Sequence, residues 1–168
     1  KIFSCIEELL PSEEWKDIKR ISVSLGPGSF TSTRISIAIA RTIAQQLKNC
    51  NVDGISSFEL MAPRLAKQLK KKEKRKPFWI RKDLPKRGFI AGKYQIDLSS
   101  DNFASELVKP SLFDKSSTLN PIIFAKENVE ADVQRLLEIS IKRHKEQQMS
   151  PWEKILPIYP ISPVSNTQ

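Results

Sequence analysis

The stretch Leu25-Gly26-Pro27-Gly28-Ser29-Phe30-Thr31-Ser32-Thr33-Arg34 joins two segments of different periodicity and decides how the chain is organised. Before it, Ile21, Val23 and Leu25 alternate with serines, which is the pattern of a buried strand. After it, apolar residues recur at helical spacing as far as Leu47. A strand, a tight turn and a helix therefore follow one another, and the stretch predicts an α/β unit.

The Gly-Pro-Gly turn allows two interpretations. Free amide groups and the helix dipole at the start of the helix could bind an anion such as phosphate. Alternatively, Ser29 or Thr31 could cap those amides, which would make the segment a tight packing turn. The segment lacks the Gly-Lys-Ser/Thr ending of a Walker P-loop. The residues favour the packing turn, and the turn motif comprises Gly26, Pro27, Gly28, Ser29, Phe30 and Thr31.

The helix predicted from Phe30 to Leu47 carries two apolar stripes. One stripe contains Ile35, Ala38, Ile39 and Ile43, and the other contains Ile37, Ala40, Ala44 and Leu47. A helix that is apolar on two sides must be covered on both. One stripe can lie on the sheet, and in a chain of 168 residues the other is expected to contact another subunit.

Other elements follow from local signals along the chain. Pro11 ends a first helix, and Ser56 with Glu59 forms a capping box for a helix that Pro63 should kink or end. Asn128 can cap a final helix. The ranges expected are a helix at Ile2–Leu10, strands at Val52–Ile55, Arg87–Ile96 and Leu119–Phe124, and an extended tail at Ile155–Val164.

These signals predict three parts. Residues 1–66 form an N-terminal half with helix, strand and helix around the Gly-Pro-Gly turn. Residues 67–86 form a basic linker, and residues 87–168 form a C-terminal α/β half that ends in the extended tail.

The positive charge of the chain is concentrated in one segment. The net charge is +9, yet residues 64–93 hold 13 basic and two acidic residues. Such a run is typical of a solvated linker, and clustered Lys and Arg can also bind an RNA backbone by releasing counterions. The candidate RNA contacts are Lys70, Lys71, Lys72, Lys74, Arg75 and Lys76.

Several classes of protein are disfavoured by composition. The chain has one histidine, His144, and two unspaced cysteines, Cys5 and Cys50, so it lacks the ligands of a structural zinc site and a base for a hydrolase. The acids Asp83, Asp97 and Asp101 are interpreted as solvated loop residues. No apolar run approaches the roughly 20 residues that span a bilayer. We therefore expect a cytoplasmic protein with reduced cysteines, no membrane segment, no catalytic residue and no metal site.

Two motifs in this chain resemble a known family. Gly26-Pro27-Gly28-Ser29-Phe30-Thr31, followed by Thr33-Arg34-Ile35, is similar to the GPGSFTGLRIG signature of the bacterial tRNA threonylcarbamoyladenosine biosynthesis protein TsaB, also called YeaZ. The segment from Gly54 to Ala62 resembles the GVSSLEALA segment of that family. Weaker similarities lie at Arg87–Tyr94 and in the tail at Ile155–Tyr159.

The resemblance implies a fold and a role. The fold would be a ribonuclease H-like, actin/sugar-kinase-like α/β sheet flanked by helices. The role would be a non-catalytic subunit that dimerises with a TsaD-like protein and, with a TsaE-like ATPase, supports threonylcarbamoyl transfer to the adenosine beside the anticodon of tRNA. ATP and metal are expected on those partners, with none in this chain. The first two helices would form the interface, through Ile2, Phe3, Ile6, Leu9, Arg34, Ile37, Ala38 and Arg41.

The sequence also departs from the family pattern. Ser32 and Ser36 stand where the family commonly has glycine, and the usual Asp-Ala-Arg is not recognisable near Asp83. The N-terminal strands of the family fold are missing, because the chain opens inside the first helix, so the strand at Ile21–Leu25 should present an open edge. The alternatives are a degenerate glycoprotease-like enzyme that binds phosphate at the turn, and a tRNA-binding module that acts through Lys70–Lys76. Self-pairing of the isolated chain is an alternative that the residues leave open.

Overall fold

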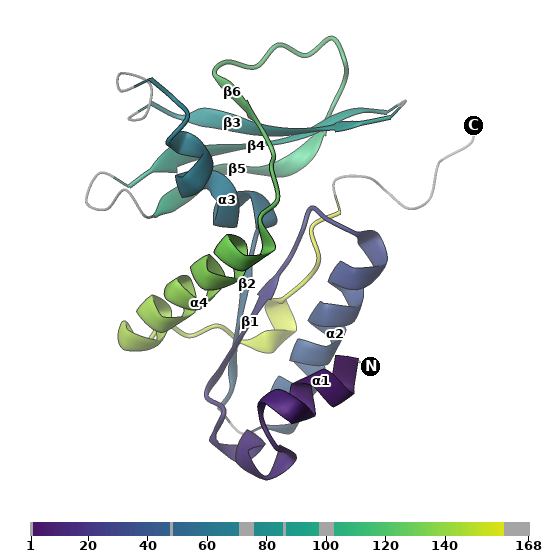
Figure 1. The fold of residues 1–168 in the computed structure, drawn as a ribbon, viewed down its shortest axis with the longest axis vertical. Coiled ribbons are helices and arrows are strands. Elements are labelled where there is room, and N and C mark those ends of the chain that lie inside the picture. The colour runs from purple at the N-terminus through teal and green to yellow at the C-terminus, as the bar shows by residue number, and fades with distance from the viewer. Residues whose placement is uncertain (1, 48, 71–75, 86, 98–102, 160–168) are drawn as a thin grey trace.

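The structure is a computed structural model that describes residues 2–47, 49–70, 76–85, 87–97 and 103–159. Helices and strands alternate along the first part of the chain, and a run of strands follows (Figure 1). The elements are α1 (Ile2–Leu9), η1 (Ser12–Asp17), β1 (Arg20–Ser24), α2 (Phe30–Gln46), β2 (Asn51–Ile55), α3 (Ser57–Ala66), β3 (Phe78–Leu84), β4 (Gly88–Ile96), β5 (Ala104–Phe113), β6 (Ile122–Phe124), α4 (Val129–Lys145) and η2 (Trp152–Lys154).

The strands form two sheets in different halves of the molecule. Strands β1 and β2 pair in parallel, with Arg20 opposite Asn51 and Ser24 opposite Ile55. The second sheet has the order β5-β4-β3-β6, in which β3 and β6 are parallel and the other pairs antiparallel. In Figure 1 the four-stranded sheet lies at the top, α1 and α2 lie at the bottom with the small sheet, and α3 and α4 lie between them.

Helix α2 covers one face of the small sheet. Its buried residues are Ile37, Ala40 and Ala44, which belong to the same core as Val23 of β1 and Val52 of β2. Burying each large aliphatic side chain contributes about 1.5–3 kcal/mol, so this contact anchors the helix. The stripe that carries Ile37 is therefore the one that the sheet covers.

The larger core lies between α3 and the four-stranded sheet. Phe58, Met61 and Leu65 from α3 pack with Phe78 of β3 and Tyr94 of β4, all nearly inaccessible to solvent. The predicted N-cap is confirmed, since the Ser56 hydroxyl accepts a hydrogen bond from the Phe58 amide at 3.3 Å. Pro63 lies inside the helix, which continues to Ala66.

The structure differs from the sequence-based expectation in the second half. Strand β3 occupies residues 78–84, which were expected to be linker, and its Phe78 and Ile80 are fully buried. Strand β5 was not predicted at all. The final helix forms as expected and Asn128 caps it, with its Oδ1 accepting from the Ala131 amide at 3.1 Å.

The end of the chain returns to the first half of the molecule. The amide of Val52 donates to the Ser150 carbonyl at 2.8 Å, and the amide of Ile158 donates to the Leu25 carbonyl at 2.9 Å. Helix α4 lies against β1, and η2 contributes to the core beneath α2. Within the described ranges, no helix has the length and apolar character needed to cross a bilayer.

Candidate protein–protein interface

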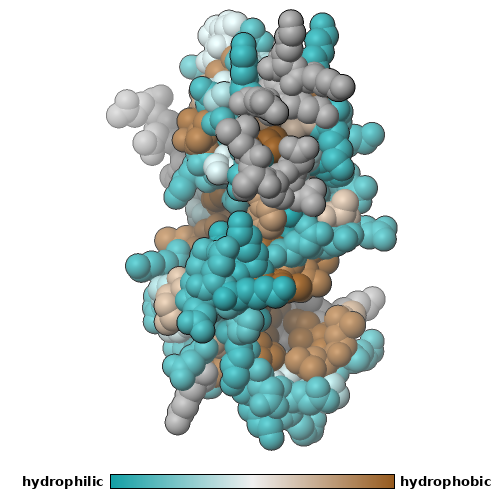
Figure 2. Space-filling model, turned by 90° about the vertical axis from the view of Figure 1, so that its left-hand side faces the viewer, coloured by the Kyte–Doolittle hydropathy of each residue, from teal (hydrophilic) through white to brown (hydrophobic). Residues whose placement is uncertain are grey.

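An apolar groove runs between the first two helices and the first strand. It has a volume of about 330 Å³. In Figure 2, apolar side chains gather at the lower right, at the height of α1 and α2 in Figure 1. The side chains lining the groove are almost all apolar and comprise Ile6, Leu10, Trp15, Ile18, Ile21, Val23, Ile39, Ala40 and Ile43, with Ser22 and Ser36.

Exposed apolar side chains extend this groove outward. Leu9 at the end of α1 is 85% exposed, and Ile35 on α2 is 46% exposed. Ala38 on the outer side of α2 is exposed as well. Isolated exposed apolar residues are common on protein surfaces, but a groove with an apolar rim marks a site of association. We call this surface, formed by the groove together with Leu9, Ile35 and Ala38, the α1–α2 surface.

The residues predicted to bind a partner do not all lie on this surface. Ile6 lines the groove, and Arg34 and Ala38 are exposed on α2. Ile2 and Phe3 lie in α1, but their side chains are outside the described part of the structure. Ile37 is 3% exposed because it packs into the core against the small sheet, so its side chain is not available to a partner.

The two arginines on α2 make different contacts. Arg34 lies over the ring of Phe30, 4.9 Å from its centroid, and remains exposed. Arg41 is half-buried: one guanidinium nitrogen, Nη1, donates to the Ile155 carbonyl at 3.3 Å, and the group lies over Trp152. Arg41 therefore fastens the tail to α2, whereas Arg34 is accessible.

The Gly-Pro-Gly turn is fixed by α3 on one side and by the tail on the other. Gly26 has a φ of +88°, a backbone conformation that favours glycine, and its carbonyl accepts from the Ser57 amide at 2.8 Å. The Ser57 hydroxyl donates to the Pro27 carbonyl at 2.8 Å. The turn thus joins the end of β1 to the start of α3, as a packing turn does.

The surroundings of the turn do not favour phosphate. Two pockets of about 170 and 230 Å³ flank it, and neither lining contains lysine or arginine among the described residues. The second includes the carboxylates of Glu127 and Asp132. The Ser29 hydroxyl makes no cap to α2 and lies 3.1 Å from the Ser32 hydroxyl.

The basic run falls mostly outside the described residues. Residues 71–75, which include Lys71, Lys72, Lys74 and Arg75, are among those that the structure does not describe. Lys70 and Lys76, at either end, are exposed. The prediction that this run binds RNA remains a prediction.

An ionic cluster that the sequence did not reveal joins α4 to the small sheet. Asp53 of β2 is fully buried and accepts from Arg20 Nη1 at 2.8 Å, Arg143 Nη1 at 3.3 Å and the Ser140 hydroxyl at 3.0 Å. The only signal in the sequence was an acid inside an otherwise apolar strand. Charges buried in this way are paired, as these are.

A half-buried carboxyl group, that of Glu59, lies at the start of α3. Burial, and next the charge of Glu106, raise the pKa of Glu59 to about 7, although Arg143 and Arg135 oppose the shift. Burial also raises the pKa of Tyr94, whose hydroxyl donates to Glu106 at 2.9 Å and lies 3.2 Å from the Ser56 hydroxyl. These groups lie beneath the four-stranded sheet, apart from the α1–α2 surface.

The described part of the chain contains no cluster of side chains suited to a metal site. No group of three or more His, Cys, Asp or Glu side chains there could hold a metal ion. His144 is exposed near the end of α4, and the thiols of Cys5 and Cys50 are both free.

The first strand has one partner among the described strands. Strand β1 pairs with β2, and no other strand of the described residues lies beside it at the edge that the sequence predicted to be open. An open edge presents unpaired backbone donors and acceptors to another strand.

Comparison with known proteins agrees with the turn motif. The family model described as TsaD, tRNA N6-adenosine threonylcarbamoyltransferase, matches residues 1–80. The tRNA threonylcarbamoyladenosine biosynthesis protein TsaB of Buchnera aphidicola subsp. Acyrthosiphon pisum (strain APS) is 27% identical over 118 residues, which are 64% of this chain and 53% of that protein. The TsaB of Buchnera aphidicola subsp. Schizaphis graminum (strain Sg) is 36% identical over 75 residues, 44% of this chain and 35% of that protein. The chain thus spans about half or less of these curated relatives.

Solved structures share the fold. A Pseudomonas aeruginosa protein described as similar to peptidase YEAZ has a TM-score of 0.68 at 15% identity, over 95% of this chain and 82% of that one. YeaZ from Pseudomonas aeruginosa has a TM-score of 0.65 at 16% identity, over 95% of this chain and 84% of that one. The fold is therefore the mixed α/β, ribonuclease H-like fold of these neighbours. The chain is thus similar in sequence to curated TsaB proteins over part of its length, and similar in fold to YeaZ structures over most of it.

Proposed function

We propose that this protein is a TsaB-like subunit in the biosynthesis of threonylcarbamoyladenosine in tRNA. In this role it pairs with a TsaD-like protein through the α1–α2 surface and performs no chemistry itself. A TsaE-like ATPase completes the assembly, and ATP and metal belong to the partners. The names of the curated relatives and the match to a TsaD family model support a role in the synthesis of threonylcarbamoyladenosine in tRNA.

One observation carries the interface. The groove between α1, β1 and α2 has an almost wholly apolar lining, and apolar residues at its rim, such as Leu9 and Ile35, are left exposed. The cores of stable protein interfaces are apolar and depleted of charge, so this surface has the composition that a partner helix requires.

The turn supports a structural role. Its carbonyl groups at Gly26 and Pro27 accept hydrogen bonds from Ser57, and the Leu25 carbonyl accepts from the tail. The turn therefore contributes its polar groups to the packing of α3 and the tail. No observation in the described residues favours the alternative of a phosphate-binding enzyme at this turn.

The pairing is tested by charge on the exposed side of α2. Ile35→Glu together with Ala38→Glu would bury two uncompensated carboxylates in the interface, which costs several kcal/mol. Since about 1.4 kcal/mol is tenfold in affinity, we expect binding of the TsaD-like protein to weaken at least about a hundredfold by isothermal titration calorimetry.

The control variant is Thr118→Glu, at an exposed position between β5 and β6 that is remote from the α1–α2 surface in sequence and structure. It should pair like the unmodified protein. Circular dichroism should show that both variants fold. Undiminished pairing of the Ile35→Glu, Ala38→Glu variant would refute the proposed surface.

A further inference from the structure

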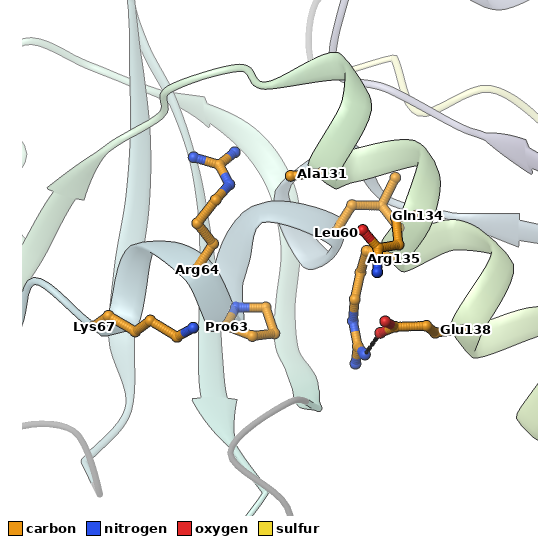
Figure 3. Close-up of a pocket in the computed structure, with 8 residues that line it drawn as sticks. All are labelled: Leu60, Pro63, Arg64, Lys67, Ala131, Gln134, Arg135 and Glu138. Atoms are coloured by element: carbon orange, nitrogen blue, oxygen red, sulfur yellow. Dashed lines mark hydrogen bonds and ion pairs between the residues drawn. The ribbon is translucent and has the colours of Figure 1, made fainter.

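A second, polar groove lies between α3 and α4. It has a volume of about 230 Å³, and Pro63 lies between Lys67 and Arg135 in it (Figure 3). Lys67 reaches toward Pro63 from α3, and Arg135 reaches down from α4 on the other side. The full lining is Leu60, Pro63, Arg64, Lys67, Ala131, Gln134, Arg135 and Glu138.

Arg135 is an unusual residue to find buried. It is 8% exposed, and its guanidinium stacks on the ring of Phe103 at 4.0 Å from the centroid. Its Nη1 donates to Glu138 Oε2 at 2.8 Å, but its Nε–H is buried with no hydrogen-bond partner in the protein. Arg64 in the same groove also has a buried, unpartnered Nε–H. Such donors cost about 1–3 kcal/mol each unless an acceptor satisfies them.

A second pocket of about 210 Å³ lies on the other side of Arg135. Lys142 and Arg143 line it together with Arg135, and the acids there are Glu59 and Glu146. The two pockets together contain five basic and three acidic side chains. Burial raises the pKa of Glu59 to about 7, which removes part of the negative charge near neutral pH.

The basic side chains differ in how far the protein already uses them. Arg143 donates to Asp53, and Arg64 donates to Asp132 at 3.0 Å and to the Lys126 carbonyl at 2.8 Å. Lys67 is exposed and makes no ion pair with any described residue. Lys142 has only a 4.0 Å contact with exposed Glu146 and lies over Phe103. Lys67 and Lys142, on either side of Arg135, are thus available to an anion.

We propose that the two pockets flanking Arg135 bind phosphate groups of an RNA backbone, with Lys67 and Lys142 as the direct contacts and Arg135 as the fixed charge between them. This inference rests on the proposed role in tRNA modification and names a surface through which the subunit itself would touch the RNA. It lies on α3 and α4, so it is distinct from the α1–α2 surface.

The position of this surface favours an extended polyanion over a small ligand. Lys67 directly follows α3, and exposed Lys70 lies three residues further along the chain. Figure 2 shows that hydrophilic side chains cover the middle of the face onto which the end of α4 projects. Phosphates along one strand would allow Lys67 and Lys142 to release counterions together.

The experiment measures binding of a fluorescently labelled tRNA transcript to the purified protein across a range of salt concentrations. The variant Lys67→Gln, Lys142→Gln should bind about tenfold more weakly, and the slope of log affinity against log salt should fall by roughly one per lysine. Lys67→Arg, Lys142→Arg keeps the charge and should retain the affinity. Both positions are exposed, so neither substitution disturbs the core.

The matched control is Lys16→Gln, Lys115→Gln, which removes the same charge from exposed positions on η1 and after β5. An equal loss in this control, or an unchanged affinity and slope in Lys67→Gln, Lys142→Gln, would overturn the proposal. Titration with inorganic phosphate, compared with chloride at equal ionic strength, distinguishes binding of free phosphate from binding of the RNA backbone. Binding of inorganic phosphate without binding of the transcript would overturn the RNA assignment.

Pairing with the TsaD-like protein is measured on the same variants. If Lys67→Gln, Lys142→Gln keeps both its pairing and its RNA affinity, the proposed RNA surface is refuted and the proposed function stands. If the unmodified protein does not pair with the TsaD-like protein but binds RNA through Lys67 and Lys142, the proposed pairing is refuted and the RNA surface stands.

Discussion

Single residues in this chain show how burial changes chemistry. Glu59 begins α3 as part of the Ser56 capping signal, yet it lines a pocket with Arg135 and Arg143. Ser56 makes its half of the cap without a reciprocal bond from Glu59 among the described hydrogen bonds. A local sequence motif fixed the start of the helix, whereas the tertiary packing of α3 against the sheet decided where the Glu59 carboxyl lies.

The raised pKa of Glu59 predicts a dependence of stability on pH. The ordinary value is 4.5 and the folded value is about 7, so between these the folded protein holds a proton that the unfolded chain releases. Stability from this group is complete below about pH 4.5 and is lost as the pH rises through about 7, by on the order of 3 kcal/mol.

Urea denaturation of the protein and of Glu59→Gln at several pH values measures this effect. The difference in unfolding free energy between the two should change as the pH rises from about 4.5 through 7, and should be constant above about pH 8. A difference that does not vary with pH would show that Glu59 keeps an ordinary pKa.

Elements with local signals were predictable from sequence. The strand before the Gly-Pro-Gly turn, helix α2 and the Asn128 cap each combine a periodic pattern with a capping or turn residue, and all are confirmed. The spare apolar side of α2 was also predictable, because Ile35 and Ala38 repeat at helical spacing. The sequence could not predict which of the two stripes contacts the sheet, because both are apolar.

Elements without local signals were missed. Strand β3 carries Arg81, Lys82 and Asp83 and follows the basic run. Because of these charged residues the segment was interpreted as part of the linker. Strand β5 is an edge strand with exposed Leu107 and Lys109, and an edge strand needs no clear alternation. The α3–α4 groove was missed because helix packing, and not spacing, brings Lys67 and Arg135 together.

The attachment of α4 to the small sheet depends on the ionic cluster at Asp53. Asp53→Asn removes the charge that Arg20 and Arg143 share and leaves two cations facing each other near the core. Breaking a buried ion pair from one side costs about 3–5 kcal/mol, so we expect a loss of about 3 kcal/mol in the free energy of unfolding. Equilibrium urea denaturation measures it.

Asp83→Asn is the matched control, because Asp83 pairs with Arg81 at 2.6 Å but its side chain is 57% exposed. Exposed pairs contribute less than about 1 kcal/mol. Equal losses in Asp53→Asn and Asp83→Asn would contradict the structural role given to the cluster.

At the scale of the molecule, apolar surface remains uncovered on more than one side. Helix α4 turns the stripe of Val129, Val133, Leu137 and Ile141 outward, with the edge of β1 open as well. Open edges and apolar patches both promote association. We therefore expect the isolated chain to self-associate, with an apparent mass by light scattering that rises with concentration.

Val133→Lys together with Leu137→Lys should lower that apparent mass toward a monomer, because lysine replaces the exposed apolar stripe. Ser116→Lys together with Thr118→Lys adds the same two charges at exposed positions between β5 and β6 and serves as control. A monomer at every concentration in the unmodified protein would contradict the expectation.

The return of the chain to its starting half has a mechanical consequence. Ser150 and Ile158 are hydrogen-bonded to Val52 and Leu25, and Asp53 of β2 binds α4. The last segments of the chain are therefore held to the first strands by contacts other than the backbone. A single protease cut between α3 and β3 would sever the backbone and still leave one particle. The two pieces would separate only in denaturant.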